Sequence, residues 1–505
     1  MATTTVSAAE LRDRVVLRPL GALAMAAVLT CAGLAITVQM PAPTPVTVLA
    51  VVGVLAAGAW MLVSERYEWS LAILMLYVGL ADGFLKLSTG SSQVTLVRDL
   101  LLYAIAAGAL IRMAVRREQP ALPPLTGWVV AWLVVIGVQL ANPENSTLMH
   151  SLASVRPHAE WVPLFFLGYV VMRSRARIRG FLMLLVVIAA VNGVVGLVQL
   201  NLTPDQLSSW GPGYEKAING EASVSQRAFV DEEGNERNRP FGLGSDIGFG
   251  GSVGFLAVPA ALALLGLGLR PDLRLLVAVL AVGVVLAVIT SEARVHVIAA
   301  LVAILAFAGL TVTSRGGVRT VIGLGVGLAV AFAALSFVFS SSEEGSFDRY
   351  QSISSPGKAL TTAYDYRSGV ISQVPNYITE IPLGAGIGSK GPAGSFGGTA
   401  GGRHLNGESE PTFLLIELGI PGLAVMLGFM LRLLYLSTTK IRRVGDRETR
   451  VLLTAVAAPL FALFATWFAG VSTATTPGAP YLWFAAGVLS YWLLGPGREQ
   501  RWSNA

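Results

Sequence analysis

The sequence predicts an all-α, polytopic membrane protein of about 14 transmembrane helices with two long outer loops, the second partly helical. Of its 505 residues, 54% are hydrophobic and 13% are charged, whereas soluble domains carry about 25% charged residues. Uncharged stretches of about 20 residues, the length that crosses a bilayer, recur along the chain. The single cysteine, Cys31, lies inside the first apolar stretch, which excludes a disulfide framework and a cysteine metal site.

The first apolar stretch, Leu20–Val38, follows three arginines and so resembles the start of a signal peptide. It is long for a signal, and the Met-Pro-Ala-Pro-Thr-Pro after it is a poor cleavage site, so we expect a retained first span. Charge clusters and Pro/Gly-rich breaks delimit the other spans. The predicted spans are residues 20–39, 46–63, 69–85, 94–115, 125–141, 159–172, 180–200, 246–269, 273–290, 293–312, 319–340, 411–436, 452–470 and 480–495.

Lysines and arginines in the short connections orient these spans, because cytoplasmic loops are enriched in them. More than half of the 36 fall at the N-terminus or in every second connection, for example at Arg173–Arg179 and Lys440–Arg450. This alternation predicts that both termini are cytoplasmic. The expected organisation is seven spans in residues 1–200, an outer loop at 201–245, spans eight to eleven in 246–340, a large outer loop at 341–410, and three spans in 411–505.

The second outer loop is far longer than a connection requires, and such loops are usually functional or disordered. Aromatic and aliphatic residues at helical spacing, such as Tyr364, Val370, Val374 and Tyr377, predict a helix within residues 360–380. A glycine-rich stretch follows at Gly384–Gly402. The alternative is a flexible spacer.

Three arginines stand out on the predicted outer face. Arg239 opens Arg-Pro-Phe-Gly-Leu-Gly, Arg294 ends Thr-Ser-Glu-Ala-Arg, and Arg367 lies in Tyr-Asp-Tyr-Arg-Ser-Gly. A cation at the edge of a bilayer is costly unless it is paired or binds an anion, and guanidinium groups offer forked donors to phosphate oxygens. The three arginines therefore favour a diphosphate ligand. The alternative is a local ion pair, with Asp231–Glu236 for Arg239, Glu292 for Arg294 and Asp365 for Arg367.

Metal and nucleotide chemistry have little support in the sequence. It contains no His-Glu-x-x-His motif, no Walker sequence and no nucleophile elbow, so we expect neither a metal nor a cofactor. The four histidines are scattered along the chain: His150, His158, His296 and His404.

Taken in order, these motifs resemble the O-antigen ligase and polysaccharide polymerase superfamily of membrane glycosyltransferases. The resemblance covers roughly residues 237–425 and includes, besides the arginine motifs, Glu380-Ile-Pro-Leu-Gly-Ala-Gly-Ile-Gly388 and Glu417-Leu-Gly-Ile-Pro-Gly-Leu423. It implies a GT-C-like membrane fold and an inverting, metal-independent transfer of sugar. The donor would be a polyprenyl-diphosphate-linked glycan on the outer leaflet of the bacterial cytoplasmic membrane, with its diphosphate on Arg239, Arg294 and Arg367.

The sequence departs from the family where the ligases tend to place a His-Asn pair. Glu408-Ser409 stand there, and His404 lies upstream. The resemblance therefore implies His404, Glu408 or Glu410 as the general base, since a partly buried glutamate can act as one. The structural alternative is that these acids belong to a solvated loop or cap a helix before Pro411.

The departure favours a polymerase, which joins lipid-linked repeats, over a ligase, whose acceptor is a lipid, a wall polymer or a protein. The resemblance implies a glycan donor, a glycan or lipid acceptor, membrane lipids and a chain-length regulator or other polysaccharide-assembly proteins as partners, and no nucleic acid. We also predict that aromatic residues stack on sugar rings, namely Trp161, Trp210, Tyr214 and Phe396. The alternative is that these side chains anchor the protein at the membrane interface.

Two other classes stay open. A lipid-linked oligosaccharide flippase or another secondary transporter would also suit many spans, although internal repeats and short loops, typical of transporters, are not evident here. A structural subunit without chemistry is the third class. Essential residues at mid-membrane would indicate transport, whereas essential arginines in the outer loops would indicate transfer.

Overall fold

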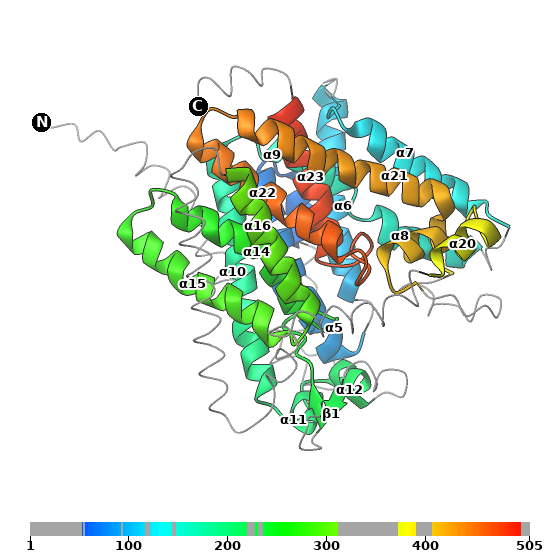
Figure 1. Cartoon of the computed structure of the whole chain (residues 1–505), viewed down its shortest axis with the longest axis horizontal. Helices are drawn as coiled ribbons and strands as arrows, with labels where there is room; N and C mark the ends of the chain where they lie inside the picture. Colours follow the sequence, from blue (N-terminus) through cyan, green and yellow to red (C-terminus); the bar gives the residue numbers. More distant parts are fainter. Residues whose placement is uncertain are drawn as a thin grey trace, which may run out of the picture. The chain divides into compact units, whose positions relative to one another are not determined.

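The computed structural model describes residues 53, 56–91, 94–116, 122–143, 148–219, 228–230, 236–311, 372–389 and 407–495. In this part of the chain the structure is helical apart from one two-stranded hairpin (Figure 1). The chain divides into two compact units. Unit 1 consists of Met1–Pro120 and Val171–His296, and unit 2 of Ala121–Val170 and Val297–Ala505.

Unit 1 contains long apolar helices and a small polar subdomain. Its elements are α4 (Tyr67–Leu76), the π-helix η2 (Tyr77–Ala81), α5 (Asp82–Thr89), α6 (Val94–Arg116), α10 (Arg175–Leu200), α11 (Pro204–Ser208), α12 (Pro212–Asn219), β1 (Ala228–Val230), β2 (Glu236–Asn238), α14 (Phe249–Gly266) and α15 (Pro271–Thr290).

Unit 2 contains the helices between α6 and α10 and those after α15. Helix α16 (Arg294–Thr311) begins in unit 1 and continues into unit 2. The other elements are α7 (Thr126–Leu140), α8 (Leu148–Ala159), α9 (Pro163–Val171), α20 (Val374–Glu380), α21 (Glu410–Lys440), the 3-10 helix η4 (Ile441–Arg443), α22 (Arg447–Thr466) and α23 (Gly478–Leu494).

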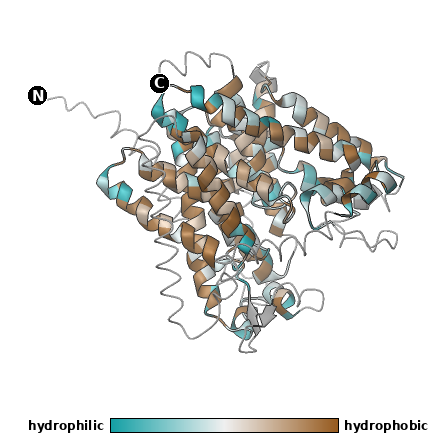
Figure 2. Ribbon diagram, viewed as in Figure 1, coloured by the Kyte–Doolittle hydropathy of each residue, from teal (hydrophilic) through white to brown (hydrophobic). Residues whose placement is uncertain are grey.

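Eight helices among the described residues are long and apolar enough to cross a membrane, which makes this a multi-pass membrane protein. Figure 2 shows hydrophobic residues along these helices and hydrophilic residues mainly near their ends. Each of the eight corresponds to one predicted span. They are Tyr67–Thr89, Val94–Met113, Arg175–Leu200, Phe249–Gly266, Pro271–Thr290, Arg294–Thr311, Glu410–Arg443 and Arg447–Thr466.

The remaining predicted spans fare differently. Spans 20–39 and 319–340 lie outside the described residues, as does part of 46–63. The spans at 125–141 and 480–495 are the shorter helices α7 and α23. The prediction of one helix over 159–172 is wrong: α8 ends at Ala159, and α9 begins only at Pro163 and has 9 residues. Nine residues rise roughly 14 Å, too little to cross a bilayer.

Helices α10, α14 and α15 pack closely because small residues line their contacts (Figure 1). A Cβ added at Gly193 of α10 would lie 2.0 Å from the carbonyl oxygen of Gly283 in α15, and one added at Gly196 would lie 2.5 Å from Oγ1 of Thr290. Small residues allow helix backbones to approach in this way in membranes. These two contacts also show that α10 and α15 run parallel, so Arg175 and Pro271 lie at the same end of unit 1.

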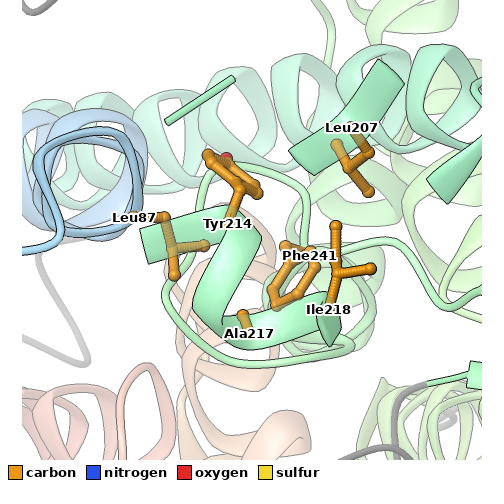
Figure 3. Packing of buried hydrophobic residues seen from close by; sticks show 6 residues of the cluster. All are labelled: Leu87, Leu207, Tyr214, Ala217, Ile218 and Phe241. Carbon is orange, nitrogen blue, oxygen red and sulfur yellow. The ribbon is translucent and has the colours of Figure 1, made fainter. Parts of the chain in front are cut away.

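At the opposite end of unit 1, the described residues of the segment 201–245 form a small subdomain that shares an apolar core with α5. A capping box at Thr203 and Gln206 begins α11, and β1 pairs with β2 in antiparallel register, Phe229 opposite Arg237. The hairpin was not predicted from the sequence. Figure 3 shows the core of this subdomain, which consists of Leu87, Leu207, Tyr214, Ala217, Ile218 and Phe241.

Candidate functional site

The loop that carries Arg239 is fixed by two amide side chains of α10. The carboxamide oxygen of Gln199 accepts hydrogen bonds from the backbone N–H groups of Phe241 (2.9 Å) and Gly242 (2.8 Å), and Gln199 Nε2 donates to the Gly242 carbonyl (2.9 Å). Asn192 Oδ1 accepts from the Leu243 N–H at 2.8 Å. Both side chains are buried. The backbone after Arg239 therefore has one well-defined conformation.

We expect Gln199→Leu to lower the free energy of unfolding by about 3 kcal/mol, because three hydrogen bonds are lost and two buried N–H groups are left without an acceptor. Denaturant unfolding in detergent measures this. The control is Asn201→Leu at the end of the same helix, where one exposed hydrogen bond is lost and we expect a change below about 1 kcal/mol. Equal effects of the two variants would contradict the structural role of Gln199.

The turn that carries Arg294 is organised by His296. Ser291 Oγ donates to the Val288 carbonyl (2.7 Å) and lies 3.0 Å from His296 Nδ1, so His296 donates to Ser291 through Nδ1. The other ring nitrogen, Nε2, then accepts from Ser252 Oγ of α14 at 3.1 Å. His296 thus connects the α15–α16 turn to the start of α14. In the same turn Glu292 is buried and has a φ of 49°, a backbone conformation rare for residues other than glycine.

The Arg239 loop and the Arg294 turn meet at one end of unit 1. Gly248 donates its N–H to the Pro240 carbonyl (3.1 Å), and a Cβ added at Gly248 would lie 2.6 Å from the ring of His296. Gly196 of α10 approaches both Pro240 and Thr290. Two arginine motifs far apart in the sequence are therefore neighbours in space.

The two arginines differ in exposure. Arg294 is exposed as the first residue of α16. Arg239 is half-buried, and among the described residues its Nε has no hydrogen-bond partner although it is shielded from solvent. Most of the acidic segment 231–236 that could neutralise Arg239 lies outside the described residues, as does Arg367. An anion placed against Arg239 would supply the missing acceptor.

In unit 2, the segments Glu380–Gly388 and Glu417–Leu423 contact each other. Helix α21 is kinked at Gly419, which has a φ of 66°. The turn after α20 fits into this kink: Ala385 donates to the Ile416 carbonyl (2.7 Å), and Ile420 donates to the Pro382 carbonyl (2.9 Å). A Cβ added at Gly419 would lie 2.5 Å from the carbonyl carbon of Leu383. Only glycine therefore suits this position, by conformation and by space.

A buried pair of polar side chains lies beside the kink. His158 Nε2 is 2.7 Å from Glu417 Oε2, and the two side chains are 1% and 3% exposed. The ring of Phe413 stacks on the imidazole at a centroid distance of 5.4 Å, and Trp132 Nε1 donates to the His158 carbonyl at 3.0 Å. This pair was not predicted from the sequence, because the partners are 259 positions apart.

The predicted acids are placed very differently. Glu410 is fully buried at the start of α21, and its carboxylate accepts hydrogen bonds from the N–H and hydroxyl groups of both Ser472 and Thr473. Glu410 therefore holds the α22–α23 connection. Ser409, whose hydroxyl accepts from Thr412 N–H, is the helix cap. Glu408 is exposed, and His404 lies outside the described residues.

The aromatic residues predicted to stack on sugars are partly core residues. Tyr214 is 0% exposed and packs edge-on against Trp210 and Phe241, and Trp161 is 3% exposed. The prediction is wrong for Tyr214 and Trp161, because no ring face is open to a ligand. Burial raises the pKa of the Tyr214 phenol, which therefore stays neutral. Trp210 is half-buried, and Phe396 lies outside the described residues.

No protein-family model matches this chain, and no curated protein matches its sequence. The site must therefore be interpreted from its own geometry. Among the described residues, no group of three or more His, Cys, Asp or Glu side chains gathers as a metal site would require. The described arrangement in unit 1 offers instead two arginines on rigid, neighbouring segments, which is the chemistry of an anion site.

Proposed function

We propose that this protein is an inverting glycosyltransferase that polymerises polyprenyl-diphosphate-linked oligosaccharide repeats at the outer leaflet of the bacterial cytoplasmic membrane. The observation that carries the proposal is the meeting of the Arg239 loop and the Arg294 turn in unit 1. Each segment is held by hydrogen bonds that are buried or partly buried, so the backbone that carries each cation is ordered before any ligand arrives. Cations on an ordered backbone stabilise developing charge at a lower reorganisation cost.

In the proposed reaction, an acceptor hydroxyl attacks the anomeric carbon of the donor sugar. A new C–O bond forms on one face while the bond to the diphosphate breaks on the other, so the configuration inverts. The polyprenyl diphosphate leaves with the electron pair, and Arg239 and Arg294 stabilise its negative charge. The proton of the acceptor passes to a general base, for which Glu408 is the exposed candidate among the described acids.

The pairing of the turn at Pro382–Ala385 with the kink at Gly419 also supports the proposal. These two motifs belong to the resemblance described above, and they hydrogen-bond to each other. The buried Glu410 is satisfied by four donors, which favours Glu408 over Glu410 as the base.

The direct test uses the purified full chain in nanodiscs with a polyprenyl-diphosphate-linked oligosaccharide. We expect release of polyprenyl diphosphate and products lengthened by whole repeats. Transfer of the glycan only to a supplied lipid, wall polymer or protein would show a ligase instead. Movement of the intact donor across the bilayer without bond cleavage would show a flippase and contradict the proposal.

Glu408→Gln and Glu410→Gln separate a catalytic acid from a structural one. We expect Glu408→Gln to lower turnover by about 100-fold, the lower range for a lost general base, with unfolding unchanged. Glu410→Gln should instead cost about 2 kcal/mol of unfolding free energy, because an amide cannot accept all the hydrogen bonds of the buried carboxylate. Turnover and denaturant unfolding measured on the same preparations decide this. The reverse pattern would assign the base to Glu410.

A further inference from the structure

A cavity of about 300 Å³ lies in unit 1 between α4 and the first half of α10. Its wall is largely apolar and includes Trp69, Met75, Met172 and Phe181. Two charged residues, Glu68 and Arg177, belong to the same lining. The volume is at the lower end of the range for small-molecule sites, about 300–1,000 Å³, which likewise combine apolar walls with a few polar groups.

The two charged residues form a loose pair. Arg177 Nη2 is 3.6 Å from Glu68 Oε2, and the side chains are 42% and 38% exposed. A charge-assisted hydrogen bond is shorter, about 2.7–2.9 Å, so each group keeps capacity to bind another partner. Arg177 is held in place by its bond from Nη1 to the Val171 carbonyl at 3.0 Å. A cation held by the backbone and a neighbouring anion thus lie side by side at an apolar cavity.

This end of unit 1 is far from the arginine site. Helix α10 has 26 residues and runs from Arg175, beside the cavity, to Leu200, beside the Arg239 loop. At 1.5 Å per residue its length is roughly 39 Å, the thickness of a bilayer with its headgroups. The cavity therefore lies at the opposite membrane surface from the proposed donor site and is independent of the proposed function.

We infer that this cavity binds an ethanolamine phospholipid, with an acyl chain against the apolar wall, the phosphate at Arg177 and the ammonium at Glu68. A purely anionic headgroup would bind Arg177, but its negative charge would then lie beside the carboxylate of Glu68, and this repulsion is unfavourable. A choline headgroup carries the same charges but has no N–H to donate to Glu68. Ethanolamine alone among these headgroups complements both residues.

Native mass spectrometry of the purified full chain, given equal amounts of ethanolamine, glycerol and choline phospholipids of matched chain length, tests the inference. We expect one ethanolamine lipid to be retained preferentially. Glu68→Gln should lower its retention relative to the glycerol lipid about fivefold, the effect of about 1 kcal/mol for a partly exposed charge pair. Arg177→Gln should weaken both lipids, and Ala176→Phe, at the cavity wall, should weaken all three.

The matched control is Asp272→Asn, which removes a similar exposed pair with Arg270 at the same end of unit 1. We expect this variant to leave the retention of all three lipids unchanged. If the glycerol lipid is preferred, or if Glu68→Gln leaves the ratio unchanged, the inference is wrong. As a second measurement on the unchanged protein, the ethanolamine lipid should raise the melting temperature more than the glycerol lipid does. Equal increases in melting temperature with the two lipids would also contradict the inference.

Discussion

Replacing Arg239 or Arg294 with alanine lowers the turnover of a polyprenyl-diphosphate-linked glycan by about 100- to 1,000-fold, if these residues stabilise the departing diphosphate. Removal of one fixed donor from a site of developing charge costs about 2.7–4 kcal/mol in comparable enzymes. Lysine in either position should restore only part of the rate, since it cannot offer the two parallel donors of a guanidinium. Initial rates of polyprenyl diphosphate release measure these effects.

Arg239 is the sharper of the two tests because its Nε is buried and has no hydrogen-bond partner among the described residues. A bound anion would supply an acceptor for this group. Arg239→Ala should therefore leave the unfolding free energy within about 0.5 kcal/mol of the unchanged protein while the rate falls.

Arg270→Ala is the control for both arginines. It removes a cation from the other end of unit 1, where the guanidinium pairs with Asp272 on the surface, and full turnover is expected. Should Arg239→Ala and Arg294→Ala also retain full turnover with unchanged donor affinity, the diphosphate site proposed for them would be wrong.

The helices were predictable where a long apolar run meets a clear polar boundary. The span predicted at 273–290 is Pro271–Thr290, with Pro271 as the first helical residue. The segment 159–172 failed because hydropathy does not reveal that a turn before Pro163 ends one helix and starts another. The kink at Gly419 was equally hidden, since its cause is a turn near Leu383 that hydrogen-bonds to the opened backbone.

The sequence singled out Arg239 and Arg294 as candidates for binding an anion, because a guanidinium at a membrane edge requires a partner. Their role in binding a diphosphate stays a prediction, and the residues that support their segments were not predicted. Gln199 and His296 could not be singled out, as an amide or an imidazole in a helix acquires its role only from the segments that pack against it. The same limit explains why Glu410 and Glu408 looked equivalent in the sequence, although one is buried and the other exposed.

Replacing Glu417 with alanine lowers the free energy of unfolding by about 3–5 kcal/mol, the cost of leaving one member of a buried polar pair without its partner. The side chain is 3% exposed and contacts His158 Nε2 at 2.7 Å. On one face the imidazole is covered by the ring of Phe413, which stacks on it. Denaturant unfolding in detergent measures the effect, and Glu380→Ala, an exposed acid of the neighbouring motif, should change it by less than about 0.5 kcal/mol.

A double-mutant cycle separates the pair from its surroundings. We expect His158→Leu and Glu417→Leu each to be costly, and the double variant to be more stable than the sum of the two predicts, because apolar side chains of similar size tolerate burial together. Additive effects would mean that the pair contributes no coupling. The pair fixes α8 to α21 directly before the kink at Gly419. Loss of turnover in the singles with recovery in the double variant would therefore assign it the role of holding that kink rather than a part in proton transfer.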